Sequence, residues 1–154
     1  MADILVRDAT PDDADALSVM IVTSIRCTNS RDYPAEEIDQ ICADFSRERI
    51  HEEMKRRVML IAESNGLLAG TISLGDDKLH SLFVHPELQG RGIAKHLVAL
   101  VEDRARAEGR ERLALSSSLT AAPFYESLGY ERDVFENRAF GATWLMSKAL
   151  RTTS

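Results

Sequence analysis

The chain has 154 residues, of which 44% are hydrophobic and 29% are charged, and this balance predicts a single globular domain over residues 1–154. The formal net charge of −6 argues against nonspecific nucleic-acid binding, which needs a basic surface. Two cysteines without C-x-x-C spacing do not make a disulfide framework, no apolar run has the length of a membrane span, and the first residues lack the pattern of a secretory signal. We therefore expect a cytoplasmic protein without nucleic-acid or membrane partners.

The first third of the chain predicts one strand followed by helices. Ile4–Arg7 has the length and apolar content of a short strand. Thr10 can then cap a helix whose first turn contains Pro11, at the position where proline is favoured. A second helical region is expected over residues 34–56, with a break near Ser46. The apolar positions of these regions recur at helical spacing and are Ala14, Leu17, Ile21, Ile25, Ile38, Ile41, Cys42 and Phe45.

The middle of the chain predicts three strands joined by tight turns. Residues 58–62 and 68–74 are apolar runs separated by Asn65–Gly66, a pair that tolerates the positive φ angles of a two-residue hairpin. A third strand is expected over residues 79–85. Pro86 ends this strand, because proline has no amide proton to donate to a strand ladder.

The last part of the chain alternates between helices and strands. We expect a helix over residues 90–108, a strand over 112–116 and a short helix over 121–128. Two further strands are expected over 130–136 and 142–149. The predicted order is therefore β-α-α-β-β-β-α-β-α-β-β, which indicates an α/β fold with a mixed sheet and helices on both faces.

The centre of this order is a β-α-β unit. It consists of strand 79–85, helix 90–108 and strand 112–117, and such units are almost always right-handed with parallel strands. On the helix, Glu102 and Arg106 have the i,i+4 spacing of an ion pair, which we expect on the exposed side.

A glycine-rich turn leads from strand 79–85 into the long helix. Gly90 and Gly92 allow the backbone to approach an anion at the helix start, where the first amides have no intrahelical acceptors. Arg91 and Lys95 add positive charge there. The spacing matches neither the G-x-G-x-x-G dinucleotide loop nor the Walker loop. Taken alone, these residues predict either a diphosphate site or a glycine-rich helix start without a ligand.

Two segments resemble motifs of the GNAT N-acetyltransferase superfamily. Residues 82–94 (LFVHPELQGRGIA) resemble its central motif, Gln/Arg-x-x-Gly-x-Gly/Ala, which follows an aliphatic-aromatic-Val strand and often His-Pro. Residues 121–130 (AAPFYESLGY) resemble its Ala-x-x-Phe-Tyr-x-x-x-Gly-Phe/Tyr segment. The resemblance covers essentially the whole chain, because the order of elements also matches, although the N-terminal helices match only in pattern. It implies a GNAT-like fold and acetyl-CoA as the cosubstrate.

The resemblance also implies a cofactor site, residue by residue. The glycine-rich turn corresponds to the pyrophosphate loop, and the strand before it corresponds to a bulged strand beside the pantetheine arm, in which the amide at about Val84 faces the thioester carbonyl. Phe124 and Tyr125 correspond to the pair beside the sulfur. Ser118 stands where the family often has an asparagine; serine can cap the next helix, but its side chain is shorter than the one that reaches the pantetheine. The cofactor-binding residues implied in this way are Leu82, Phe83, Val84, Gln89, Gly90, Arg91, Gly92, Ile93, Ala94, Lys95, Ser118, Phe124 and Tyr125.

The mechanism that the resemblance implies is direct attack of a neutral primary amine on the acetyl thioester. Tyr125 is the expected catalytic acid, because the pKa of a phenol, about 10, lies near that of the departing thiol, about 8.5. His80, His85, Glu63 and a water relay are open as the general base, and none is assigned. No metal is expected, because the two histidines lack metal-pair spacing on one face. Tyr33, between the first two helices, is open as an acceptor-pocket residue or a plain loop residue.

The expected function is acetyl-CoA-dependent transfer to a primary amine of a small molecule or a protein. The alternative is a noncatalytic acyl-CoA-binding regulator, which has no need of a proton donor at Tyr125. A toxin that acetylates aminoacyl-tRNA is disfavoured by the acidic balance of the chain. Dimers are common among such enzymes, so a homodimer is among the expectations, and the acceptor is left open.

Overall fold

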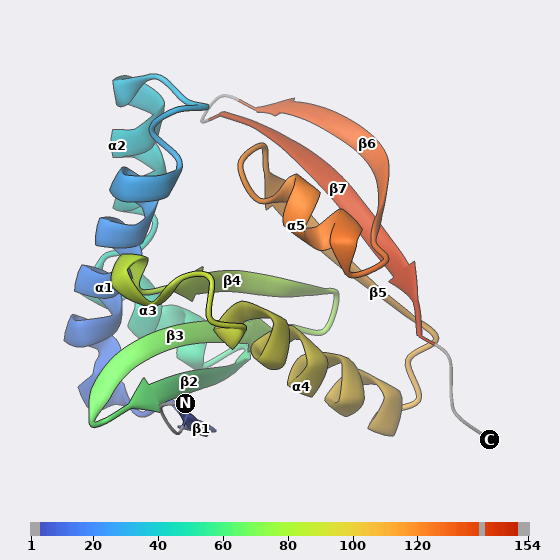
Figure 1. Ribbon diagram of the computed structural model, residues 1–154, viewed down its shortest axis with the longest axis horizontal. Helices are drawn as coiled ribbons and strands as arrows, with labels where there is room; N and C mark the ends of the chain where they lie inside the picture. Colours follow the sequence, from blue (N-terminus) through green and yellow to red (C-terminus); the bar gives the residue numbers. More distant parts are fainter. Residues whose placement is uncertain (1–3, 139–140, 151–154) are drawn as a thin grey trace.

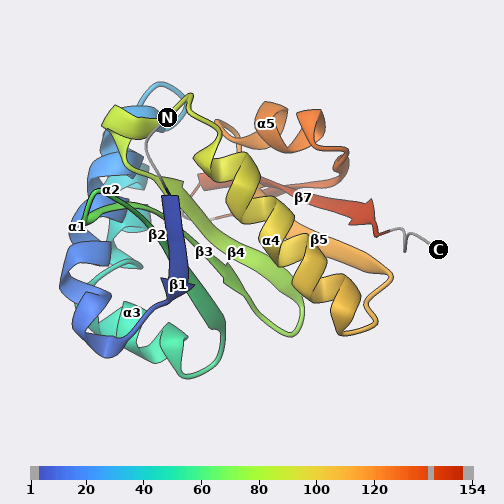
Figure 2. The same ribbon diagram turned by 60° about the horizontal axis from the view of Figure 1, so that its bottom comes forward.

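The computed structural model describes residues 4–138 and 141–150, which form a mixed sheet with helices on both faces (Figure 1, Figure 2). Seven strands lie in the order β1-β2-β3-β4-β5-β7-β6. Only β4 and β5 are parallel neighbours, and the other neighbouring pairs are antiparallel. The strands are β1 (Ile4–Asp8), β2 (Val58–Ser64), β3 (Leu67–Leu74), β4 (Lys78–Val84), β5 (Arg112–Ser118), β6 (Glu131–Arg138) and β7 (Gly141–Ala149).

The helices form two layers, with α1, α2 and α3 on one face of the sheet and α4 and α5 on the other (Figure 1, Figure 2). The predicted order of elements is confirmed, and the helical region expected over residues 34–56 is two helices that separate around Ser46. Within the described ranges, every helix is too short or too polar to cross a bilayer. The helices are α1 (Ala14–Thr28), α2 (Ala35–Ala43), α3 (Arg47–Met54), α4 (Ile93–Ala107) and α5 (Ala122–Ser127), with short 3-10 turns η1 (Pro11–Asp13) and η2 (Pro86–Leu88).

Each helical layer encloses its own apolar core. Between the sheet and the α4–α5 layer, Leu97 of α4 packs with Leu115 of β5 and Met146 of β7, all fully buried. Between the sheet and the α1–α3 layer, Leu17 of α1 packs with Ile61 of β2. Burying a side chain of this size contributes about 1.5–3 kcal/mol, so the two cores hold the helices firmly on the sheet.

Tight turns lie where the glycines predict them. Asn65 and Gly66 have φ angles of 52° and 80°, and they join β2 to β3 as a two-residue hairpin. The start of the long helix needs a correction. Helix α4 begins at Ile93 rather than near Gly90, because Gly90 and Gly92 have φ angles of 79° and 83°, which no right-handed helix contains.

Strand β4 is joined to β5 over only two residue pairs, Lys78 with Ala114 and Leu79 with Leu115. Beyond these pairs the strands diverge, while β5 stays paired with β7 over its whole length (Figure 1). A bulge occurs at the point of divergence, because Ser81 and Leu82 of β4 lie opposite the single residue Ile72 of β3, and Ser81 has a φ of 54°. The bulge expected in this strand is therefore present.

An ionic cluster fixes the start of the chain to the sheet. The Asp13 carboxylate accepts hydrogen bonds from the Thr10 amide at 2.7 Å and from the Arg7 guanidinium at 2.9 and 3.0 Å. Arg7 also pairs with Glu63 of β2. The hydrogen bond from Arg7 is the main cause that lowers the pKa of Asp13 to about 2.

We expect Asp13→Ala to lower the free energy of unfolding by about 1 kcal/mol at pH 7, the usual effect of a lost cap. The folded-state pKa of Asp13 lies below the unfolded value, so its contribution is present above pH 4 and declines as the pH falls toward 2. Urea unfolding at pH 7, 4 and 3 measures this, with exposed Asp12→Ala from the same turn as the control. A loss that is equal at all three pH values would contradict the role of the charge.

Candidate active site

The turn between β4 and α4 is shaped by two glycines with left-handed backbone. A Cβ atom at Gly90 or Gly92 would meet no protein atom within 4 Å, so glycine is needed there for its positive φ and not for lack of room. The Gln89 side chain donates a hydrogen bond to the Val84 carbonyl at 3.3 Å and fastens the turn to the end of β4. The sequence gives no signal for this contact. The turn is thus fixed, with open space beside its backbone.

The first turn of α4 has the properties of an anion site. Its first backbone bond runs from the His96 amide to the Gly92 carbonyl, so the earlier amides have no intrahelical acceptor, and no side chain of a described residue caps them. Ile93 is buried and anchors the helix start, whereas Arg91 and Lys95 are exposed. Neither cation forms an ion pair with another described residue. Free amides, the helix dipole and two unpaired cations together favour a diphosphate.

The edge of β4 beside this turn is unpaired where β5 has diverged. The His85 amide donates to the Ala69 carbonyl of β3 at 2.8 Å. Because successive amides of a strand point to opposite edges, the Val84 amide points toward the side of β5. Leu82 and Val84 pack toward α4, and Phe83 packs on the opposite face against Phe45, with ring centroids 5.1 Å apart. An extended ligand can lie along this edge and accept its amide.

The divergence of β4 and β5 leaves an opening between the two strands. Tyr125 lies on α5, across this opening from β4. The residue is 6% exposed, and its ring meets Phe124 at 5.4 Å and Tyr130 at 5.8 Å between centroids, both edge-on. Its hydroxyl forms no hydrogen bond with the part of the chain that the structure describes. Burial raises its pKa above the ordinary value of 10, so the hydroxyl is protonated at neutral pH. It is a donor that lacks an acceptor.

The start of α5 is fixed by Ser118 at the end of β5. Its hydroxyl accepts a hydrogen bond from the Ala121 amide at 3.1 Å and closes the turn before α5, whereas the N-cap of α5 is Ala121, which has no side-chain cap, so helix capping by Ser118 is not observed. Because the Ser118 oxygen is engaged in this way, it holds the turn that carries Phe124 and Tyr125. Its contact with a pantetheine stays a prediction.

A buried ionic cluster includes Tyr130, whose ring packs against Tyr125. Glu102 of α4 accepts hydrogen bonds from the Tyr130 hydroxyl and from Lys148 of β7, each at 2.9 Å. The expectation that Glu102 lies on the exposed side of its helix is wrong, because it is 6% exposed, and Arg106 lies 3.9 Å away as a weaker partner. Local spacing could not show this, since the two closer partners come from distant parts of the chain.

The candidate bases differ in their surroundings. Glu63 pairs with Arg7 on β1 and β2, away from the opening, and His85 accepts the Glu87 amide at 3.1 Å. His80 is the residue after Leu79, which forms the last β4–β5 pair. Its imidazole ring forms a hydrogen bond with the Asp77 carboxylate at 3.1 Å. Burial lowers the pKa of His80, which favours the neutral imidazole. The ion pair with Arg7 disfavours Glu63, and no base is assigned.

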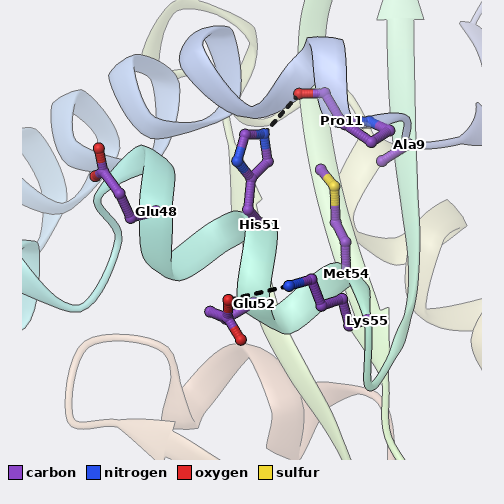
Figure 3. Close-up of a pocket in the computed structure, with 7 residues that line it drawn as sticks. All are labelled: Ala9, Pro11, Glu48, His51, Glu52, Met54 and Lys55. Atoms are coloured by element: carbon purple, nitrogen blue, oxygen red, sulfur yellow. Dashed lines mark hydrogen bonds and ion pairs between the residues drawn. The ribbon is translucent and has the colours of Figure 1, made fainter.

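Other polar groups do not extend the site. A cavity of about 570 Å³ lies between α3 and the start of α1, lined by Ala9, Pro11, Glu48, His51, Glu52, Met54 and Lys55 (Figure 3). It contains no residue of the glycine turn or α5, and its His51 and Lys55 are already bonded, to the Pro11 carbonyl and to Glu52. Among residues 4–138 and 141–150, no three potential metal-ligating side chains are grouped to hold an ion.

Comparison with known proteins agrees with this arrangement. Residues 29–148 match the family model described as "Acetyltransferase (GNAT) domain". The chain is 28% identical to the uncharacterized N-acetyltransferase YafP of Escherichia coli over 131 residues, 85% of this chain and 83% of that protein. A GCN5-related N-acetyltransferase from Rhodopseudomonas palustris superimposes with a TM-score of 0.90 at 28% identity, over 97% of this chain and 98% of that one. The PaiA N-acetyltransferase of Thermoplasma acidophilum, solved with coenzyme A, shares the fold with a TM-score of 0.82 at 22% identity, over 96% and 99% of the two chains.

We expect coenzyme A to raise the melting temperature, by an amount equivalent to about 2.7 kcal/mol at 100 times its dissociation constant. Gly92→Glu should abolish this shift, because it places bulk and negative charge where the diphosphate binds. Gly66→Glu is the matched control, since Gly66 has nearly the same φ and equally open surroundings but lies in the β2–β3 hairpin. A shift that persists in Gly92→Glu, or that is lost in both variants, would rule out the anion site.

Proposed function

Since the chain belongs to the GNAT family of acetyltransferases and is an acetyl-CoA-dependent N-acetyltransferase, we propose that a primary amine attacks the thioester directly and that Tyr125 protonates the departing sulfur. The observation that carries this proposal is Tyr125, a largely buried residue whose hydroxyl has no hydrogen-bond partner among the described residues, on the far side of the opening from the unpaired β4 edge. A noncatalytic binder has no use for such a donor, and family membership favours the enzyme.

Acetyl-CoA is proposed to lie across both parts of the site. Its pyrophosphate binds the amides of residues 90–95, with Arg91 and Lys95 contributing charge. Its pantetheine arm lies along β4 at residues 82–84, where the strand edge is unpaired. The thioester then reaches the opening between β4 and α5, where Phe124 and Tyr125 border the sulfur.

The reaction proceeds without a covalent enzyme intermediate. The lone pair of the neutral amine forms the new C–N bond, and the carbonyl oxygen becomes negative. We assign the Val84 amide as its donor, and one such donor is typically worth about 3 kcal/mol. The tetrahedral intermediate collapses, the C–S bond breaks, and the sulfur takes the Tyr125 proton. The proton released by the amine passes to solvent and restores the phenol, so the products are the N-acetyl amide and coenzyme A.

The raised pKa of Tyr125 fits this role in one way and constrains it in another. The hydroxyl is protonated throughout the physiological range, so the donor is always ready. A higher pKa also makes a phenol a weaker acid, which limits the transfer to a thiolate in water. The sulfur, however, is released into the same apolar surroundings, which raise the pKa of a thiol as well. Burial therefore shifts the pKa values of the donor and of the acceptor in the same direction.

The acceptor is proposed to be a primary amine of a small molecule or a protein. A cytoplasmic location and a homodimer, which the sequence and the family resemblance favour, stay predictions.

We expect Tyr125→Phe to lower kcat by about 100-fold or more, the usual range for a lost general acid, with little change in the KM for acetyl-CoA. Release of coenzyme A thiol with a panel of amines measures this. Tyr130→Phe is the control, because it removes a buried tyrosine hydroxyl one ring away, the one bonded to Glu102, and should lower stability more than kcat.

Full activity of Tyr125→Phe with every accepted amine would defeat the acid assignment. Coenzyme A binding without thiol release for any amine would instead favour the noncatalytic regulator.

We also expect no alkaline loss of kcat from ionisation of Tyr125 up to pH 10, because burial raises its pKa and keeps the acid protonated at higher pH. An ordinary phenol with a pKa of about 10 would leave half the protonated form at that pH. The pH profile of kcat at saturating amine, corrected for thioester hydrolysis, measures the difference. A halving at pH 10 that Tyr125→Phe abolishes would show an ordinary pKa.

A further inference from the structure

Tyr33 connects three segments that are distant in sequence. It lies between α1 and α2 and is 5% exposed. Its hydroxyl donates a hydrogen bond to the Ala142 carbonyl of β7 at 2.6 Å and accepts one from the Leu119 amide, just after β5, at 2.8 Å. The hydroxyl is therefore fully engaged with backbone and offers no free donor to an acceptor substrate.

Two further contacts hold the same segments together. The Thr120 hydroxyl donates to the Asp32 carboxylate at 2.6 Å. The Tyr33 ring also lies against Gly141, where an added Cβ would come within 2.9 Å of Cε1. The connection between α1 and α2 thus reaches the start of β7, as the upper part of Figure 1 shows.

These bonds span the divergence of the sheet. Helix α1 packs on β3 and β4, whereas Leu119 and Ala142 belong to the β5–β7 side. The two sides are joined at one end by the pairs of Lys78 and Leu79 with β5. The Tyr33 hydroxyl joins them again at the other end. The separation between β4 and β5 is consequently fixed at both ends of the opening.

The Tyr33 bonds also fix the place where α5 begins. Leu119 immediately follows Ser118, whose hydroxyl accepts the Ala121 amide, and the Tyr125 amide bonds to the Ala121 carbonyl at 3.2 Å. A short run of hydrogen bonds, two of them to side-chain hydroxyls, therefore leads from Tyr33 to Tyr125. A shift of Leu119 would move the Tyr125 hydroxyl relative to β4.

We propose that Tyr33 is a positioning residue for acetyl transfer, whose two hydrogen bonds set the distance between β4 and α5 and so align the Tyr125 hydroxyl with the sulfur. This inference rests on the proposed function of Tyr125. The cofactor cradle on the β4–α4 side is not touched by Tyr33, so the effect falls on the transfer step and not on cofactor binding.

The test is Tyr33→Phe, which keeps the ring against Gly141 and removes both hydrogen bonds. We expect kcat to fall about tenfold or more, because small misplacements of reacting groups have effects of this size, with the KM for acetyl-CoA within twofold. Thr120→Val, which breaks only the bond to Asp32, should show a smaller fall of the same kind. Thr28→Val is the matched control, since its hydroxyl bonds to Ser24 within α1 and not across the opening.

A double mutant separates positioning from simple destabilisation. If Tyr33 acts through Tyr125, Tyr33→Phe should change kcat less than twofold in a Tyr125→Phe background, because the two effects are not additive. Unchanged kcat in Tyr33→Phe and Thr120→Val, a loss confined to the KM for acetyl-CoA, or a full additional fall in the double mutant would overturn the inference. Failure of the proposed function is distinct, since the Tyr125→Phe single mutant would then keep full activity.

Discussion

The pairing of β4 with β5 ends after two residues, and the rest of the site depends on this break. Within a continuous sheet, β5 would occupy the edge of β4 along its length and no ligand could approach it. Because β5 stays with β7 while β4 stays with β3, the sheet opens in its middle without losing the strands on either side. The bulge at Ser81 lies where the two directions separate. The unpaired edge of β4 leads directly to the glycine turn. The backbone amides available to an extended ligand arm are therefore followed along the chain by the amides available to a diphosphate.

An opening in the middle of a sheet needs support from outside it. The two apolar cores provide this on the faces, since α4 covers one and α1 covers the other. Polar contacts provide this support at the ends of the opening. Glu102 is buried with Tyr130 and Lys148 and connects α4 to β7, and Tyr33 connects the α1–α2 segment to β5 and β7. Both groups join elements that the sheet hydrogen bonds do not join, which explains why polar side chains are buried there.

The chemistry is divided between the two sides of the opening. In the proposed complex, the pyrophosphate and the pantetheine arm bind to α4 and β4 through backbone amides and exposed cations, whereas the proposed proton donor belongs to α5 on the other side. Under the proposed mechanism, the geometry between the two sides acts on the transfer step rather than on cofactor affinity. The glycine turn would serve a pure binder equally well, whereas the proposed proton donor Tyr125 has a role only in an enzyme.

Much of this protein follows from local sequence. The order of elements, the Asn65–Gly66 hairpin and the glycine turn were predictable, because periodicity and positive φ angles are properties of a few adjacent residues. Helix α4 starts three residues later than predicted for the same local reason, since Gly92 is left-handed. The tertiary structure alone decided that Glu102 is buried, that Glu63 is taken by Arg7, and that the Tyr33 hydroxyl spans the opening. Each of these depends on partners dozens of residues away, and no pattern along the chain specifies which distant groups the folded backbone brings within hydrogen-bond distance.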